Sequence, residues 1–474
     1  MLGSVAGWVD RLPALLIGGG LVAVALAAYW LPGMDRYYNH FVWQALAFLH
    51  GTAVIDYPVN AGGFPKGNDW MQDIYPLSQL TGNPSTPGAL LPFPPLPAIV
   101  LAPFVAVWGI ATDIRAVSVL VGAVDVGIAW WALGRLPVSR RIRLATTIFF
   151  GFGTVLWYAA QLGTTWFFAH VVAVGFILAA VGVALGADRA ADDEVDDLAP
   201  MPALVRSVVD QLRRPLALLD RRQIIVGLLF GLACTARLPV LFGAPFFMLV
   251  GGGGTWVRRS VSAGIGTALP VGLLLLYNVA TTGHVFHPGY DWQYQREANG
   301  YPTLNYNPAW GIEDPRYLVQ NLGIMFLSTP AIAPELAPET LGDGAPVCTD
   351  PGATRGLFDK TCPLAEPRAI GMSVLLTSPA FLLAFFALRS RRSRLVAGSY
   401  LAIVLIAIVN LMHFSQGWVQ FGYRFSNDFV VFALPLVALG MARRGGVRWL
   451  GFGLIVASVA INLWGVIWGN ILGW

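Results

Sequence analysis

The chain has 474 residues, of which 56% are hydrophobic and only 12% are charged, and its formal net charge is +4. Soluble domains carry about 25% charged residues, well above the fraction in this chain. The mean hydropathy of the chain is +0.63, which is that of an apolar sequence. Repeated apolar runs of roughly 18 residues or more predict an all-α polytopic membrane protein. The alternating segments of a membrane β-barrel are absent from the sequence, and the small net charge does not indicate nucleic-acid binding.

The first apolar run, Leu12–Leu31, has the length of one membrane crossing. It lacks the Ala-x-Ala cleavage signature of a secretory signal peptide. We therefore expect residues 1–32 to form a retained first transmembrane helix.

The next segment, residues 33–113, is long, polar and aromatic. Loops longer than about 15 residues are usually functional or disordered, and this one is too aromatic for disorder. His40, Trp43, Ala47 and His50 recur at helical spacing, which predicts an amphipathic surface helix. We expect a large extracytoplasmic loop that carries juxtamembrane helices.

Four aspartates in this loop could carry chemistry: Asp35, Asp56, Asp69 and Asp73. A carboxylate near a lipid headgroup can act as a general base on an acceptor hydroxyl. We predict Asp35, which closely follows the first span, and Asp69, in a Gly-Asn-Asp-Trp turn, as catalytic candidates. The alternative is that these aspartates cap helices and turns.

The apolar part of this loop, Pro92–Trp108, is short and rich in proline. If it crossed the membrane, the arginines between 135 and 143 and every later arginine cluster would face outside. We therefore predict that it lies at the outer surface.

The later apolar runs predict the remaining spans: Ile114–Leu133, Leu144–Ala160, Trp166–Leu185, Val261–Ala280, Ile370–Leu388, Leu395–His413, Phe429–Met441 and Trp449–Trp468. Between Gln223 and Val250 we expect a hairpin of two short helices broken at Arg237-Leu238-Pro239, because proline ends the first helix. The total is about eleven transmembrane helices.

The arginine-rich loops place the N-terminus inside and the C-terminus outside, in the plasma membrane. This topology divides the rest of the chain into a transmembrane core at 114–281 with a cytoplasmic loop at 187–222, extracytoplasmic loops at 282–368, and C-terminal transmembrane helices at 369–474. Cys348 and Cys362 flank a polar loop on the outer side, where a disulfide can form.

Three arginines are predicted near the outer face as ligands of a donor phosphate: Arg115, Arg237 and Arg424. Arginine pairs with phosphate in a bidentate manner, and intramembrane ionisable residues are functional candidates. The alternative is that they snorkel or pair with nearby carboxylates, namely Asp113, Asp125 and Asp428.

Aromatic, imidazole and phenolic side chains gather near the outer ends of the spans. We predict seven of them as substrate contacts: His40, Trp70, Tyr75, His170, Tyr290, Trp418 and Tyr423. The alternative is an aromatic belt at the membrane interface. The sequence has no metal-ligand spacing, no Walker motif, no G-x-G-x-x-G opening a helix after a strand, and no G-x-S-x-G elbow. We expect no cofactor, although a divalent metal stays open.

Several segments together carry a resemblance: MDRYYNHF, PFPPLPAIVLAPF, ATDIRAVSVL, GLLFGLACTARLPVLFGAPF, LLLYNVATTGHVFHPGY and GWVQFGYRFSNDFVVFALPLV. The chain resembles the GT-C superfamily of membrane glycosyltransferases, which includes protein O-mannosyltransferases and lipid A aminoarabinose transferases. The resemblance covers roughly Leu12 to Leu439 in short, divergent motifs. It implies that Asp35 is the base and that Arg237 and Arg424 contact the lipid phosphate. Arg36 follows Asp35 where many relatives have a second acid, which makes Asp69 the rival base.

These observations predict an inverting glycosyltransferase that transfers a sugar from a polyprenyl-phosphate donor to a hydroxyl of a glycan, lipid or protein at the extracytoplasmic face. Two other classes stay open. A transporter or flippase of lipid-linked sugars would favour repeat symmetry and broken helices. A non-enzymatic membrane assembly protein would tolerate loss of every outer aspartate.

Overall fold

The computed structural model describes residues 11–31, 38–55, 73–190, 219–297, 307, 309–338, 344–390, 392–417 and 419–474. The first half of the described chain contains these elements: α2 (Ala14–Trp30), α3 (His40–Leu49), β1 (Tyr75–Pro76), α4 (Leu77–Thr81), β2 (Ala89–Leu90), α5 (Leu96–Trp108), the 3-10 helix η1 (Gly109–Ala111), α6 (Ile114–Leu133), α7 (Arg140–Phe152), α8 (Leu156–Leu162), α9 (Thr165–Ala190) and α11 (Arg221–Cys234).

The second half contains the following elements: the 3-10 helix η3 (Leu238–Gly243), α12 (Ala244–Leu249), α13 (Trp256–Thr282), α14 (Gly289–Glu297), η4 (Pro315–Tyr317), α15 (Leu318–Leu327), β3 (Ala331–Ile332), β4 (Ala365–Glu366), α16 (Val374–Thr377), η5 (Pro379–Arg389), α17 (Ser393–Met412), η6 (Arg424–Asp428), α18 (Val430–Arg443) and α19 (Trp449–Leu472).

The described chain is mostly helical, and five of its helices are long and apolar enough to cross a membrane: α6, α9, α13, α17 and α19. The pair α7 and α8 is apolar enough to count as a sixth, although it bends by 47°. The prediction of a helical protein with membrane-spanning helices is therefore confirmed at this level.

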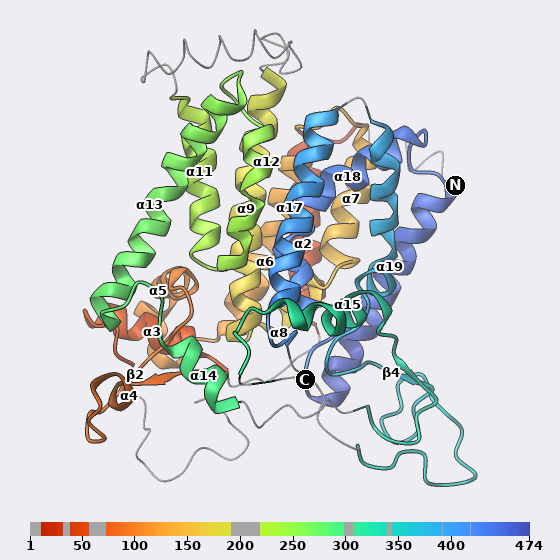
Figure 1. The fold of residues 1–474 in the computed structure, drawn as a ribbon. Coiled ribbons are helices and arrows are strands. Elements are labelled where there is room, and N and C mark those ends of the chain that lie inside the picture. Colours follow the sequence, from red (N-terminus) through yellow and green to blue (C-terminus); the bar gives the residue numbers. More distant parts are fainter. Residues whose placement is uncertain are drawn as a thin grey trace.

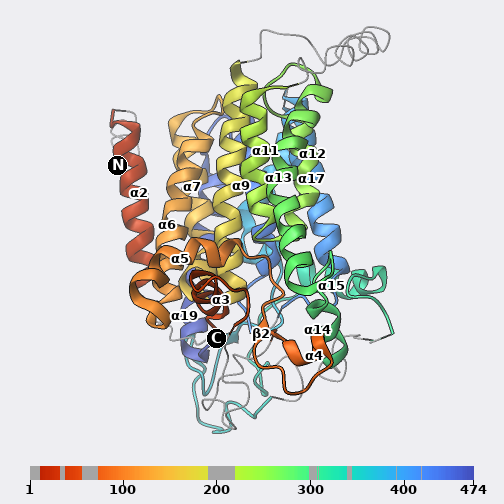
Figure 2. The same cartoon turned by 90° about the vertical axis from the view of Figure 1, so that its left-hand side faces the viewer.

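The long helices form a bundle with two different ends (Figures 1 and 2). One end, here called the loop end, carries α3, α4, α5, α14 and α15, and it is drawn at the bottom of Figure 1. Two small antiparallel ladders also lie there, with Tyr75 opposite Leu90 in β1–β2 and Ala331 opposite Glu366 in β3–β4. A disulfide joins Cys348 to Cys362 between β3 and β4, a pairing that the sequence had left open.

At the opposite end, arginines donate to backbone carbonyls of neighbouring segments. Arg140 donates to the carbonyl of Leu12 at 2.7 Å, and Arg143 donates to that of Trp130 at 2.6 Å while its guanidinium lies 3.5 Å from the Trp130 ring centroid. Both arginines belong to the first turn of α7, Leu12 precedes α2, and Trp130 lies in the last turn of α6. These two bonds therefore connect the start of α7 to the start of α2 and to the end of α6.

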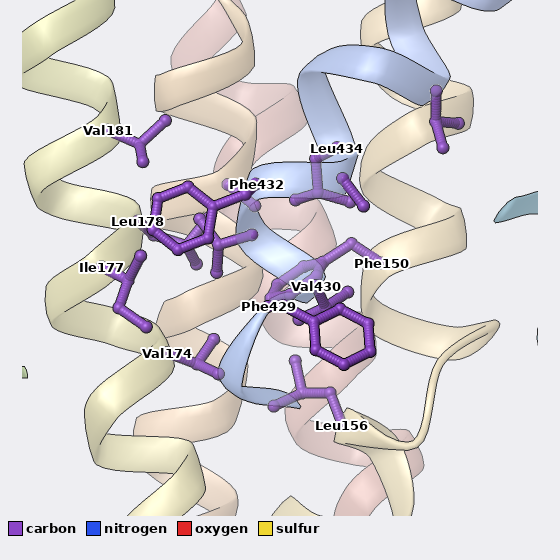
Figure 3. Close-up of a cluster of buried hydrophobic side chains, with 14 of the residues drawn as sticks. Phe150, Leu156, Val174, Ile177, Leu178, Val181, Phe429, Val430, Phe432 and Leu434 are labelled. Atoms are coloured by element: carbon purple, nitrogen blue, oxygen red, sulfur yellow. The ribbon is translucent and has the colours of Figure 1, made fainter. Parts of the chain in front are cut away.

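The apolar core lies between α9 and α18, with α7 and α8 beside them (Figure 3). Ile177 and Leu178 of α9 point toward Phe432 of α18, while Phe150 lies close to Val430. Phe425 and Phe429, on either side of Asp428 in the sequence, both belong to this core, which therefore holds the end of η6 in place.

Two predicted spans differ from simple helices. The run Leu144–Ala160 is broken between α7 and α8, where Gly153 ends α7 and the Thr154 hydroxyl donates to the carbonyl of Phe150. The run Ile370–Leu388 is divided at Ser378 into α16 and the 3-10 helix η5, because Pro379 cannot continue the helix. The predicted break at Arg237 is confirmed, since α11 ends at Cys234 and η3 begins at Leu238.

The loop after α2 contains the two predicted helices, α3 and α5, which pack on each other. Six of the ten residues of α3 are buried. α3 is therefore packed against the bundle and is not the surface helix that the sequence predicted. α5 begins at Leu96, one residue after Pro95, and contains Pro103.

α11 and α13 approach each other so closely that their backbones touch at two glycines. A Cβ on Gly227 would overlap the carbonyl of Ala263, and a Cβ on Gly266 would overlap the carbonyl of Ile224. Small residues permit such contacts between helices in membranes.

We predict that Gly266→Ala lowers the free energy of unfolding in detergent by about 1–3 kcal/mol, the usual cost of overpacking. The control is Gly264→Ala on the same helix, where a Cβ would meet no atom within 4 Å. It should leave the thermal transition unchanged or raise it slightly, because alanine favours helix by up to about 1 kcal/mol. Equal shifts for both variants would contradict the close crossing.

Candidate functional site

The site is built on the first turns of α9 at the loop end. The hydroxyl of Thr165 lies 2.8 Å from Nδ1 of His40 and donates to the carbonyl of Tyr38. These bonds attach the start of α3 to the start of α9. Trp166 and His170 are one turn apart and therefore share a face of α9.

A buried carboxylate, that of Asp428, holds four segments together. Its Oδ1 accepts from Nε of Arg237 at 3.1 Å and lies 2.9 Å from Nδ1 of His170. Its Oδ2 accepts from Nη2 of Arg237 at 2.9 Å and from Nδ2 of Asn410 at 3.1 Å. Asp428 belongs to η6, His170 to α9 and Asn410 to α17, and Arg237 lies in the link between α11 and η3.

Within the Asp428 network, the charge of Asp428 is compensated by its partners, whereas Arg237 is partly exposed to solvent. Burial alone would raise the pKa of Asp428, but the Arg237 guanidinium and the His170 ring together hold that pKa below its usual range. The side chain of Arg237 is 20% exposed, whereas that of Asp428 is 0% exposed. Nη1 of Arg237 has no acceptor among the described residues, so it can donate to a ligand.

Phe425 brings a second arginine beside the first. The guanidinium carbon of Arg237 lies 5.3 Å from the Phe425 ring centroid, and that of Arg424 lies 5.1 Å from the same centroid. The two guanidinium groups are therefore no farther apart than the sum of these distances. A Cβ at Gly417, whose φ is +98°, would lie 2.8 Å from the guanidinium carbon of Arg424, so only glycine allows this approach.

A carboxylate from the first loop reaches the same end of α9. Asp73 has a left-handed backbone with a φ of +65°, and its Oδ2 accepts from the indole nitrogen of Trp166 at 2.6 Å. Burial raises the pKa of Tyr290, and the charges of Arg237 and Asp73 act on it in opposite directions. Tyr290 of α14 is therefore within electrostatic range of both Asp73 and Arg237, and its ring packs against Phe93 at a centroid distance of 6.1 Å.

A second polar pair borders the site. Oε1 of Glu313 lies 3.1 Å from Nδ1 of His413, and the His413 ring meets Phe425 edge-on with centroids 6.3 Å apart. Glu313 also acts electrostatically on Tyr290. The surroundings of Phe425 thus contain both cations and a carboxylate.

The predicted site residues fall into three groups. Arg237, Arg424, His170 and Tyr423 gather around Asp428 and Phe425, with Tyr290 within electrostatic range of Arg237; the hydroxyl of the buried Tyr423 donates to Oε1 of Gln416 at 2.7 Å. The second group does not touch Asp428 or Phe425: His40 lies at the start of α9, where its ring is 6.0 Å from that of Trp166, and Arg115 and Tyr75 are engaged elsewhere. The remaining four lie outside the described residues: Asp35, Asp69, Trp70 and Trp418.

The contacts of Arg115 and Tyr75 show what they do instead. Arg115 donates to the carbonyls of Trp30 and Gln161 and lies 5.3 Å from the Trp30 ring, so it closes the end of α2. Tyr75 packs edge-on against His287 and Trp292 in the loop layer. The pairing alternative named for the arginines applies to Arg237, whose partner is Asp428.

The sequence reasoning did not select Asn410, Phe425, Glu313 or Asp73 as site residues. Asp73 stood among the aspartates of the first loop, but no local signal separated it from Asp35 and Asp69. Phe425 directly follows Arg424 in the sequence, and this adjacency was the one signal that could have identified Phe425 as a site residue. In the described part of the chain, no group of three or more His, Cys, Asp and Glu residues could hold a metal ion.

The arrangement is suited to a ligand that is anionic and rich in hydrogen-bonding groups. Two guanidinium groups beside one aromatic ring can bind phosphate oxygens. Nε2 of His170 and both side-chain polar atoms of Asn427 are buried without a hydrogen-bond partner among the described residues. Polar atoms of this kind can form hydrogen bonds with a bound water or ligand.

No protein-family model, curated protein or solved structure matches this chain. Any inference about function therefore rests on the geometry of the site.

We predict that Asp428→Asn and Arg237→Gln each lower the free energy of unfolding by about 3–5 kcal/mol, because each leaves a buried partner uncompensated. The double variant should lose less than the sum of the two. Thermal unfolding of the purified protein in detergent measures all three.

The matched control for this cycle is Arg316→Gln. Arg316 makes the same bidentate contact with Asp314, at 2.8 Å for both bonds, but its side chain is 55% exposed. Its loss should cost no more than about 1 kcal/mol. Additive effects at Arg237 and Asp428, or losses as small as that of the control, would contradict a coupled buried network.

Acidification should weaken the loop layer through His287. Its Nδ1 accepts from the backbone N–H of Gly289 at 3.0 Å, and burial lowers its pKa from 6.5 to about 4. Because the unfolded state binds the proton more readily, stability should fall as the pH drops from about 6.5 to about 4. His287→Gln should remove part of this slope in thermal unfolding measured across that range; an unchanged slope would show that His287 is not the sensor.

Proposed function

We propose that this chain is an integral membrane glycosyltransferase of GT-C type, which transfers a sugar from a polyprenyl-phosphate donor to an acceptor hydroxyl. One observation carries the proposal: Arg237, Arg424 and a carboxylate of the first loop, Asp73, gather around the first turns of α9. Ionisable groups at the end of an apolar bundle are functional candidates. A lipid phosphate needs cations at this position, and an acceptor hydroxyl needs a base.

The arrangement that we propose for this chain has about eleven crossings. The six candidate spans supply part of this number. The shorter apolar segments α2, α11, η3 with α12, η5 and α18 would supply the others. The segregation of arginines at the end opposite α3 and α14 supports a plasma-membrane protein with the site on the extracytoplasmic side, the N-terminus inside and the C-terminus outside.

The proposed reaction is a direct displacement with inversion. A first-loop aspartate accepts the proton of the acceptor hydroxyl, and the hydroxyl oxygen forms a bond to the anomeric carbon of the sugar. The bond between that carbon and the phosphate oxygen breaks, and its electron pair stays on the phosphate. Arg237 and Arg424 stabilise the departing phosphate, which is already anionic. Asp35 and Asp69 are the bases that the sequence predicted. Asp73 is a third candidate because its carboxylate accepts a hydrogen bond from Trp166 at the start of α9.

The broken helices favour a second candidate, a transporter or flippase of lipid-linked sugars. The 47° bend between α7 and α8 and the break between α11 and η3 are of the kind that builds substrate sites in transporters. Movement of a lipid-linked sugar across reconstituted vesicles, without transfer to an acceptor, would favour this candidate over the enzyme.

We predict that membranes containing the wild-type protein transfer label from at least one member of a panel of radiolabelled polyprenyl-phosphate sugars. Arg237→Gln and Arg424→Gln should each reduce transfer by roughly 10²–10³-fold, the usual effect of removing one donor to a developing anion. The variants Asp35→Asn, Asp69→Asn and Asp73→Asn identify the base. The one that removes it should lower transfer by roughly 10²–10⁴-fold.

Arg316→Gln serves as the control, because it removes a loop-end arginine that contacts Asp314 and Trp310 rather than the Asp428 network. It should keep nearly full transfer. Full activity in all three aspartate variants would rule out a first-loop base, and absence of transfer from every donor would overturn the proposed function.

A further inference from the structure

α15 is a ten-residue helix that lies across the loop end rather than along the bundle axis (Figure 1). About 20 apolar residues are needed to cross a bilayer, so α15 cannot span one. Its sequence, LVQNLGIMFL, nevertheless contains no charged residue. In Figure 2 it projects outward beyond the lower end of α17.

The inner face of α15 is tied to the end of α17. Nδ2 of the buried Asn321 donates to the carbonyls of Leu411 and His413, at 2.8 and 2.9 Å. These carbonyls lie at the C-terminal end of α17, where intrahelical donors are missing. Ile324 and Met325 pack into the main core on the same side. The rotation of α15 about its own axis is therefore determined.

The opposite face presents an apolar stripe. Val319, Leu322 and Phe326, spaced to share one side of the helix, are 83%, 41% and 42% exposed, and Leu327 is 77% exposed. The described residues therefore leave Val319 and Leu327 largely uncovered and Leu322 and Phe326 partly uncovered. A contiguous apolar surface of this kind marks contact with a membrane or a partner.

Two features of the surroundings identify the membrane as the occupant. First, α17 is a candidate span with Leu401, Val404 and Ile408 exposed along it, and the C-terminal end of α17 is the end to which α15 is bonded. Acyl chains that cover this stripe would end where α15 begins.

Second, the ends of α15 carry the residues that mark a membrane interface. Arg316 lies in η4, two residues before α15 begins, and its guanidinium carbon is 4.3 Å from the centroid of the Trp310 ring, which itself packs on Tyr317. Arg368 donates to the carbonyl of Thr329 just after the helix. Tryptophan, tyrosine and arginine are enriched at the headgroup level, and apolar faces of such helices sit at the boundary of the acyl chains.

We propose that α15 is an interfacial helix whose Val319–Leu322–Phe326 face is immersed in the lipid leaflet at the loop end. The proposal does not depend on glycosyl transfer. It also sets the depth of the site, because the backbone of His413 binds Asn321 and the ring of His413 contacts Phe425. Phe425 and the arginines beside it would then lie close to the lipid headgroups.

Spin-label accessibility tests the proposal in vesicles of phosphatidylcholine and phosphatidylglycerol. Leu322→Cys and Phe326→Cys are labelled in a Cys234→Ala background with the Cys348–Cys362 disulfide intact. Val404→Cys on the exposed face of α17 is the acyl-chain reference, and Ala353→Cys in an exposed loop is the aqueous reference.

The ratio of accessibility to oxygen over accessibility to a nickel chelate should be at least roughly threefold higher at 322 and 326 than at 353, and lower than at 404. A ratio equal to that at 353 would place the face in water and overturn the proposal. Exclusion of both reagents would show that a second copy or another protein covers the face, which would overturn it as well.

Discussion

The buried carboxylate of Asp428 is the constraint on which the loop end depends. Burial of an unpaired carboxylate costs several kcal/mol, so it must be met by partners of good geometry. Arg237, His170 and Asn410 meet it from α11–η3, α9 and α17, up to 258 residues away in sequence. The same contacts that compensate the charge therefore fix where Arg237 stands and which of its nitrogens are left for a ligand.

The two ends of the bundle use arginine for different purposes. At one end, Arg140 and Arg143 donate to the backbone carbonyls of Leu12 and Trp130 and connect α7 to the segments beside it. At the loop end, Arg237 pairs with a carboxylate and shares the Phe425 ring with Arg424. An aromatic ring beside two guanidinium groups attracts both cations through its quadrupole and shields part of their surface from water. This difference is why the loop end is the better candidate for binding an anion.

Apolar run length was sufficient to predict α6, α9, α13, α17 and α19, and proline placed the break at Arg237. It did not predict the bend at Gly153 or the division at Ser378, because hydropathy reports burial and not backbone geometry. At the site, Arg237 and Arg424 stood out as charges in apolar surroundings. The choice of Asp428 over Asp113 or Asp125 as a partner, and the position of Asp73, depend on tertiary packing that local sequence does not encode.

The most direct measurement of the central claim is an experimental structure of the protein in lipid nanodiscs with a bound polyprenyl-phosphate sugar. The account predicts the phosphate within hydrogen-bond distance of Arg237 and Arg424, beside Phe425, with the sugar toward Trp166 and Asp73. A phosphate bound at the opposite, arginine-capped end of the bundle, or at the loop end but away from both guanidinium groups, would contradict it.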